Sequence, residues 1–138
     1  MSVMLIFITP STTEFKLFNS KVSAGFPSPA DDYIEESLSL DELLIKHPSA
    51  TYMVKAQGNS MIGAGIYDGD ILIIDRALTA TTGDIVIASI DGEFTCKYLD
   101  LEAKELRPAN PRYSAIKIKE DIELLIEGVV TSSMRMHR

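Results

Sequence analysis

From residue 51 onward, apolar residues occur in short runs that are broken by glycine and aspartate. Runs of four to eight residues bounded by such turn residues are typical of β-strands. Five runs fit this description and predict five strands, over residues 52–56, 71–75, 84–90, 93–99 and 123–131. The pattern therefore predicts a compact, mainly β domain.

Asp91 and Gly92 stand between two of these strands and predict a two-residue hairpin loop. Both central positions of a type I′ turn have a positive φ angle, which Asp and Gly tolerate. Alternation along the following strand then separates two faces, Glu93, Thr95, Lys97 and Leu99 on one and Phe94, Cys96 and Tyr98 on the other. We therefore expect Cys96 to point away from Lys97.

Residues 1–38 show no sustained period of 3.6 or 2, and several prolines interrupt them. We expect a flexible, extended N-terminal arm over residues 1–38 and a folded domain over residues 39–138. The apolar start of the arm is six residues long, too short for a membrane span of about 20 residues. It is also too short for a signal-peptide core. We expect it to pack on its own domain or on a partner subunit.

A capping-box pattern at Ser39–Glu42 predicts one short helix, over about residues 40–46. Glu42 can reach back to the amide of Ser39, and apolar residues follow. The helix should end before Pro48, because the residue before a proline avoids helical geometry.

The composition excludes several function classes. At 138 residues and 46% hydrophobic content the chain can bury one core. A net charge of −7 without a run of Lys or Arg argues against autonomous DNA binding. The single cysteine excludes an internal disulfide framework, and two distant histidines give no metal-ligand spacing, so we expect no metal and no cofactor. This composition fits a reducing cytoplasm, without a membrane anchor.

Ser60 follows Gly58 and Asn59 in a segment that predicts a tight turn. A nucleophilic serine needs an exposed hydroxyl on such a turn, with backbone amides nearby to hold the oxyanion. The Gly-rich stretch that follows predicts that Ser60 opens a short helical turn, and the amides of Ser60 and Met61 are the candidate oxyanion donors. The residues leave open a second interpretation, a serine that only caps the turn.

Lys97 is the candidate general base. Burial disfavours the ammonium form, and a neutral amine can take a proton from a serine hydroxyl. The same-face neighbours Thr95 and Leu99 are weakly polar and apolar, which allows a partly dry site. The alternative is a solvated lysine at the edge of a sheet.

Ala24 and Gly25 form a small-residue pair within the arm and are the candidate cleavage site. Small side chains let an extended backbone lie close to a catalytic groove. Delivery of this segment within its own chain would give it a high effective concentration. The pattern therefore favours a protein that cuts itself.

Three other sites are less favoured. His47 could join Ser60 in a Ser-His-Asp triad, but its place before Pro48 favours a charge near a helix C-terminus. Cys96 has no nucleophile signature and is expected to be a small buried thiol. Residues 68–70 resemble the start of a calcium loop, yet the apolar run that follows favours a turn into a strand.

Several ordered blocks of sequence resemble the UmuD proteins of bacterial SOS mutagenesis, in the wider LexA-like group of self-cleaving serine peptidases. The similarity runs over nearly the whole chain and includes residues 25–30, 47–52, 58–62, 66–70, 83–88 and 91–97. Ala24 stands where the best-known UmuD proteins carry cysteine, and it resembles the Ala-Gly bond of LexA repressors. Asn59 replaces an acidic residue that is common there.

The resemblance implies a LexA- and signal-peptidase-like twisted β-sheet, with a peptidase S24 catalytic domain over residues 39–138. It implies Ser60 as nucleophile, Lys97 as general base and scission between Ala24 and Gly25. A RecA filament on single-stranded DNA is expected to stimulate the cut. The product, residues 25–138, is expected to be an accessory subunit of a UmuC-type error-prone translesion polymerase, and both forms are expected to be homodimers.

Two alternatives belong to other classes. One is a catalytically idle polymerase-interaction module, in which Ser60 and Lys97 only support the fold. The other is a fragment of a LexA or phage-type repressor. The arm is too short for a helix-turn-helix and has no basic recognition helix, which argues against sequence-specific DNA binding.

Overall fold

The computed structural model describes residues 2–7, 13–18 and 35–138. The predicted cleavage site, Ala24-Gly25, lies outside these residues. Contacts divide the chain into one unit of Met1–Ile8 with His47–Arg138 and a second unit of Thr9–Lys46.

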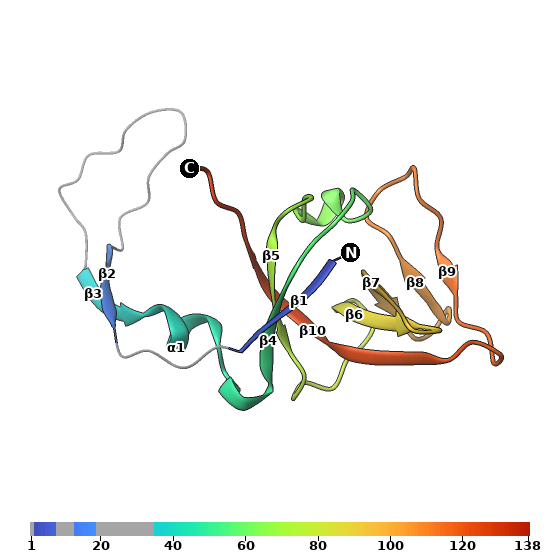
Figure 1. The fold of residues 1–138 in the computed structure, drawn as a ribbon, viewed down its shortest axis with the longest axis horizontal. Coiled ribbons are helices and arrows are strands. Elements are labelled where there is room, and N and C mark those ends of the chain that lie inside the picture. Colours follow the sequence, from blue (N-terminus) through green and yellow to red (C-terminus); the bar gives the residue numbers. More distant parts are fainter. Residues whose placement is uncertain (1, 8–12, 19–34) are drawn as a thin grey trace. The chain divides into compact units, whose positions relative to one another are not determined.

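The larger unit is built on an antiparallel sheet. Its strands are β1 (Ser2–Phe7), β4 (Thr51–Lys55), β5 (Ile71–Asp75), β6 (Ile85–Ile90), β7 (Glu93–Asp100), β8 (Glu105–Arg107), β9 (Ile116–Lys117) and β10 (Leu124–Met134). Within the described residues these eight strands follow the order β1-β4-β5-β10-β6-β7-β8-β9 (Figure 1). The expectation of a mainly β fold around a sheet is confirmed.

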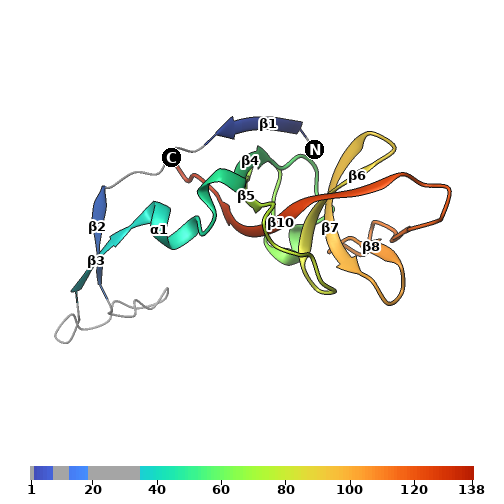
Figure 2. The ribbon, with the colours of Figure 1, turned by 90° about the horizontal axis from the view of Figure 1, so that it is seen from below.

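Strand β10 lies in the interior of this sheet, although it is the last strand of the chain. It pairs with β5 on one side and with β6 on the other. Figure 2 shows its long ribbon running between these two neighbours. Through the sheet, β10 therefore joins the half that contains β4 and β5 to the half that contains β6 and β7.

All five predicted strands are present, as β4, β5, β6, β7 and β10, with ends that differ by a few residues. Strands β8 and β9 were not predicted. Strand β1 lies in the range expected to be an arm, yet it pairs with β4, with Ile6 opposite Met53. The segment therefore pairs with a strand of its own chain, the first of the two alternatives that the sequence left open.

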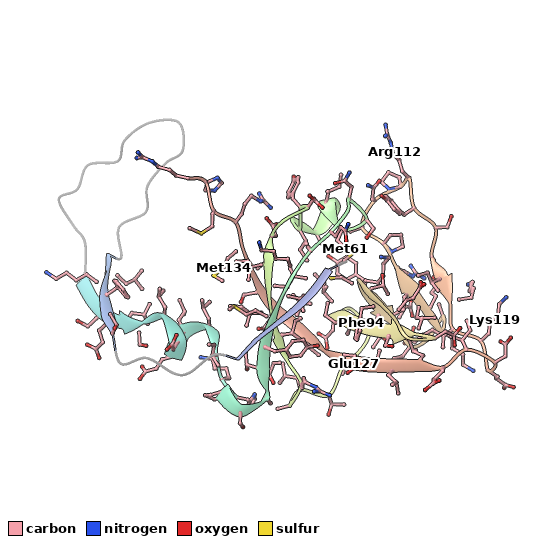
Figure 3. All side chains as sticks on the ribbon, viewed as in Figure 1. Met61, Phe94, Arg112, Lys119, Glu127 and Met134 are labelled. Carbon is pink, nitrogen blue, oxygen red and sulfur yellow. The ribbon has the colours of Figure 1, made fainter. Side chains whose placement is uncertain are left out.

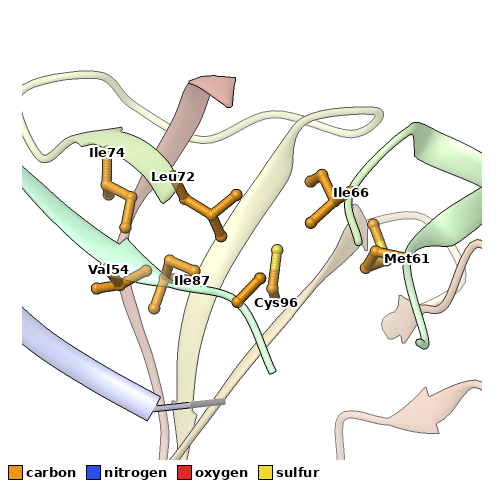
Figure 4. Close-up of a cluster of buried hydrophobic side chains, with 8 residues drawn as sticks. Val54, Met61, Ile66, Leu72, Ile74, Ile87 and Cys96 are labelled. Carbon is orange, nitrogen blue, oxygen red and sulfur yellow. The ribbon is translucent and has the colours of Figure 1, made fainter. Parts of the chain in front are cut away.

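Two hydrophobic clusters form the core of the larger unit. One, shown in Figure 4, contains Val54, Met61, Leu72, Ile74 and Cys96 among its buried members. The other is built from Val86, Ala88, Leu99, Leu106 and Val129. Burial of such side chains is the main driving force for folding, so these clusters fix the strands that carry the candidate site.

The β6–β7 hairpin has the predicted two-residue loop. Asp91 has a φ angle of 49° and Gly92 one of 86°, as a type I′ turn requires. The register pairs Val86 with Lys97 and Ile87 with Cys96. Residues opposite each other in adjacent strands share a face, so Lys97 and Cys96 leave opposite faces of β7, as the alternation predicted.

The smaller unit contains the paired strands β2 (Glu14–Phe18) and β3 (Glu35–Ser39), followed by helix α1 (Leu40–Leu44). Ser39 occupies the predicted N-cap position. The helix ends two residues earlier than predicted, because Ile45 already has extended backbone angles. A β-branched residue near Pro48 favours such geometry. In the described ranges, no helix has the length and apolar character needed to cross a bilayer.

Candidate active site

Ser60 lies in a loop between β4 and the short 3-10 helix η2 (Ile62–Ala64). The loop starts at Gly58, whose φ angle of 91° is one that glycine adopts without strain. The Gly58 amide donates to Asp68 Oδ1 at 2.8 Å, which holds the entrance of the loop. The helical turn was expected to open at Ser60; Ser60 lies in a turn closed by the Ile62 amide and the Asn59 carbonyl oxygen, and Met61 is the N-cap of η2.

A second loop, at residues 109–110, braces the Ser60 loop. The Ala109 amide donates to the carbonyl oxygen of Ser60 at 2.8 Å, and the Gly63 amide donates back to Ala109 at 2.7 Å. Asn110 Nδ2 donates to the carbonyl oxygen of Asn59 at 2.8 Å. These three bonds hold the backbone of the Ser60 loop in place.

Lys97 reaches Ser60 from the middle of β7. Its Nζ atom lies 3.0 Å from Ser60 Oγ, and it also contacts Thr95 Oγ1 at 2.8 Å and the carbonyl oxygen of Cys96 at 3.1 Å. The residue is 8% exposed. The structure therefore brings together the two side chains that the sequence singled out, and it buries the lysine.

The contacts of Lys97 suit both of its protonation states. An ammonium group can donate to all three oxygen atoms. A neutral amine can donate to Thr95 Oγ1 and the Cys96 carbonyl, and its lone pair can accept the Ser60 hydroxyl proton. Burial lowers the pKa of Lys97 from 10.5. Among the described residues no carboxylate forms an ion pair with it, so the cost of burying the charge outweighs the contacts that favour the ammonium.

A small cavity of about 90 Å³ opens beside these two side chains. Its lining includes Gly58, Ser60, Met61, Thr95 and Lys97. No backbone hydrogen bond within the described residues uses the amides of Ser60 or Met61. A cavity of this size admits a small side chain.

Cys96 belongs to the core cluster, as expected of a buried thiol, and it also lines this cavity. Burial raises the pKa of its thiol to about 11, and the nearby Lys97 opposes that rise. A thiol nucleophile acts as the thiolate. The environment of Cys96 therefore disfavours nucleophilic chemistry.

His47 lies elsewhere. Its Nδ1 atom is 2.6 Å from Asp75 Oδ2, and the Asp75 side chain is buried. The expected role as a charge near a helix C-terminus stays a prediction, and the structure adds a contact with a buried carboxylate of β5 that the sequence did not indicate. Within the described residues, the Ser60 side chain contacts Lys97 and not His47, so a Ser-His-Asp triad finds no support.

Residues 68–70 form a turn into β5, as the sequence favoured over a calcium loop. Asp70 is 2% exposed and accepts bonds of 2.8 Å from Arg135 Nε and from Arg135 Nη2. Arg135 also donates to the carbonyl oxygen of Gly65 and lies over the Tyr67 ring, 4.1 Å from its centroid. No group of three metal-donor side chains gathers within the part of the chain that the structure describes.

Sequence reasoning missed several supporting residues. Thr95 was noted as a same-face neighbour, and its spacing from Lys97 was the only signal for its contact. Nothing in the sequence pointed to Ala109 and Asn110, or to the pairing of Arg135 with Asp70. These contacts join segments far apart in the chain, and local patterns carry no information about them.

Known proteins match the chain over most of its length. The Peptidase S24-like family, a family of serine peptidases, matches residues 16–131. Protein SamA from Salmonella typhimurium (strain LT2) is 42% identical over 140 residues, covering 98% of both chains. Protein MucA from Escherichia coli is 46% identical over 119 residues, covering 85% of this chain and 82% of MucA.

Two further relatives extend this comparison. Protein ImpA from Shigella flexneri is 51% identical over 118 residues, covering 83% of this chain and 79% of ImpA. The LexA repressor from Alcanivorax borkumensis is 40% identical over 117 residues, which span only 56% of that repressor. The similarity to UmuD proteins is thereby confirmed, and the chain belongs to the Peptidase S24-like family as a member of its UmuD group.

Proposed function

We propose that the protein is a self-cleaving serine peptidase of the SOS response, in which Ser60 is the nucleophile and Lys97 the general base. The observation that carries the proposal is the 3.0 Å separation between Lys97 Nζ and Ser60 Oγ at a buried lysine. A base within hydrogen-bond distance of a hydroxyl is the geometry that proton transfer requires. Membership of a serine peptidase family adds support.

In the first half of the reaction, the neutral Lys97 amine takes the Ser60 hydroxyl proton as Oγ attacks the carbonyl carbon of Ala24. The amides of Ser60 and Met61 are the proposed donors to the oxyanion that forms. The intermediate collapses when the Lys97 ammonium returns the proton to the nitrogen of Gly25. Gly25 becomes the free amino terminus of residues 25–138, and an ester joins Ser60 to Ala24.

In the second half, the Lys97 amine, neutral again, takes a proton from water, and the hydroxide attacks the ester. Ser60 regains its proton from Lys97, and residues 1–24 leave with a carboxylate at Ala24. The small cavity beside Ser60 is compatible with this choice of bond, since its volume of about 90 Å³ leaves room for the small side chain of Ala24.

The cut changes the charge of the protein very little. The removed segment carries Lys16 and Lys21 against Glu14, so the product is slightly more acidic than the chain with its net charge of −7. An acidic product gains nothing for DNA binding. We therefore propose that its output is protein contact, as a homodimeric accessory subunit of a UmuC-type translesion polymerase, after stimulation by a RecA filament on single-stranded DNA.

Incubation of the purified full chain at alkaline pH tests the peptidase. Mass spectrometry should find a fragment that begins at Gly25, and Ser60→Ala and Lys97→Ala should each abolish it. Ser133→Ala and Lys119→Ala change an exposed residue of the same type and serve as matched controls. An intact chain under all conditions would instead favour an idle interaction module.

A second experiment tests the partners. RecA filaments assembled on single-stranded DNA should accelerate formation of the same fragment near neutral pH. The purified fragment should then elute with a UmuC-type polymerase during gel filtration, as a complex that contains two copies of the fragment. A rate that does not respond to RecA would contradict the proposed regulation.

A further inference from the structure

A second hollow lies beside Ser60 and has no part in the mechanism above. Its volume is about 350 Å³, roughly four times that of the cavity at Lys97. It is lined by Asn59, Ile62, Asn110, Arg112 and Tyr113, and we call it the Tyr113 groove. Ile62 and Tyr113 give it apolar walls, while Asn59, Asn110 and Arg112 are polar.

The Ser60 loop separates the two hollows. Gly58, Ser60 and Met61 line the small cavity, whereas the intervening Asn59 and the following Ile62 line the Tyr113 groove. The two linings share no residue. A peptide whose scissile carbonyl lies at Ser60 Oγ therefore has two separate hollows beside the same loop.

The walls of the Tyr113 groove are held by hydrogen bonds. Asn110 donates to Asn59 through its side-chain nitrogen, and its side-chain oxygen accepts the Arg112 amide at 3.0 Å. The Tyr113 amide donates to the carbonyl oxygen of Asn110 at 3.1 Å. Because these walls are already fixed, little conformational entropy is lost when a side chain enters the groove.

We propose that the Tyr113 groove is a specificity site for the leaving side of the scissile bond, and that it receives the side chain of Phe26. This inference rests on the proposed function and adds a second recognition element to it. The substrate class is an extended segment with a small residue before the cut and an aromatic residue two positions after that small residue.

The spacing of the segment supports this assignment. In an extended peptide, residues i and i+2 point to the same side and lie about 6.6 Å apart. When Ala24 faces the catalytic loop, Phe26 faces it too, on the far side of the scissile bond. The larger hollow, with an aromatic wall at Tyr113, matches a ring better than a methyl group.

Charge distinguishes the two directions along the segment. Val22 also has the i−2 relation to Ala24, but the chain on that side carries Lys21. The chain beyond Phe26 carries Asp31 and Asp32. Arg112 is exposed and projects outward from its loop (Figure 3). A cation at the groove attracts the acidic side of the cleavage segment and repels the basic side.

A double-mutant cycle on the self-cleavage rate of the full chain tests the proposal. Phe26→Ala and Tyr113→Ala should each slow cleavage, by about tenfold for a lost aromatic contact with its buried area. The double variant should be no slower than either single variant, because residues in contact are not additive. Circular dichroism checks that each variant is folded. Phe15→Ala, which changes an exposed phenylalanine outside the cleavage segment, should cleave at the wild-type rate.

Other results would overturn the assignment. Multiplicative effects of the two substitutions would show that Phe26 and Tyr113 do not interact. Coupling of Tyr113→Ala with Val22→Ala, rather than with Phe26→Ala, would place the opposite side of the bond in the groove. Both results require a wild-type chain that cleaves, so they differ from a failure of the proposed function, in which the wild-type chain stays intact.

Discussion

Lys97 Nζ lies closer to Thr95 Oγ1, at 2.8 Å, than to Ser60 Oγ, at 3.0 Å. Thr95 and Lys97 both lie on β7, two positions apart, so the strand itself sets the separation of these two residues. A lysine side chain has several rotatable bonds, and each fixed contact removes some of that freedom. Thr95 therefore directs the amine toward the serine hydroxyl.

Replacement of Thr95 by valine should lower the maximal self-cleavage rate, roughly tenfold, because the amine loses an orienting partner. The ammonium form loses a hydrogen-bond acceptor, which lowers the pKa of Lys97 further. The pH of half-maximal rate should therefore move down while the plateau falls. A pH–rate profile measures both quantities, with Thr79→Val on the surface as the control. A fall in the rate without a shift in the pH of half-maximal rate would show that Thr95 affects only the packing of the site and not the pKa of Lys97.

The wild-type rate should rise about tenfold per pH unit and then level off at the pKa of Lys97, because only the neutral amine accepts the proton. Burial lowers that pKa from 10.5, so the plateau begins below this value. A rate that still rises above pH 10.5 would point to direct attack by hydroxide. Stopped incubations across the alkaline range, separated by electrophoresis, provide the measurement.

The same pKa shift makes a prediction about stability. At pH values between the folded-state and unfolded-state pKa of Lys97, the unfolded state binds more protons than the folded state. The contribution of Lys97 to the free energy of unfolding therefore increases with pH in this range. Urea unfolding of Ser60→Ala with and without Lys97→Met, across that window, isolates the effect. The stability of the lysine-containing protein relative to the Met variant should improve with pH, and an opposite slope would mean that the folded state favours the ammonium.

Substitution of Gly63 by alanine should disturb the brace between the two loops at the site. An added Cβ would lie 2.5 Å from the Ala109 carbonyl oxygen, a backbone atom that cannot move alone. We expect a loss of about 1–3 kcal/mol in the free energy of unfolding, together with slower cleavage. Gly83→Ala is the control: its φ angle of 97° imposes strain, but nothing lies near the added atom. Equal cleavage rates in the two variants would show that the brace does not position Ser60.

The hydrogen-bonded ion pair between Arg135 and Asp70 should make the free energy of unfolding depend on pH in the acidic range. Hydrogen bonds from Arg135 lower the pKa of Asp70 below its usual 3.8, so the pair stabilises the fold above that value. The contribution is lost as the pH falls through the folded-state pKa of Asp70. Arg135→Ala should therefore lower the urea midpoint at pH 7 and change it much less under strongly acidic conditions. Arg135→Lys keeps the charge without the planar fork and should recover only part of the loss.

The sequence predicted the elements that local patterns determine. Alternation and turn residues located β5 and β7, and the Asp-Gly pair set the hairpin register that places Lys97 and Cys96 on opposite faces. The identity of Ser60 and Lys97 as a candidate pair came from their residue types and the family resemblance. Their separation in space could not be read from a chain in which other elements intervene.

Local patterns also failed where strands are very short. Strand β8 has three residues and β9 two, too few for any periodicity. Glu105 in β8 forms ion pairs with Arg107 and Lys117, and charged residues such as these are ordinarily assigned to loops. Strand β1 was missed because an apolar run without a visible partner does not reveal whether it joins a sheet.

The interior place of β10 imposes an order on events during synthesis. A chain emerging from the ribosome presents Ser60 and Lys97 well before Leu124–Met134, the strand that lies between their two halves of the sheet. Until that strand is translated, β5 and β6 have no common neighbour to unite them. Under the proposed mechanism, a nascent polypeptide therefore completes the sheet that carries the Ser60–Lys97 pair only after Leu124–Met134 has been synthesised.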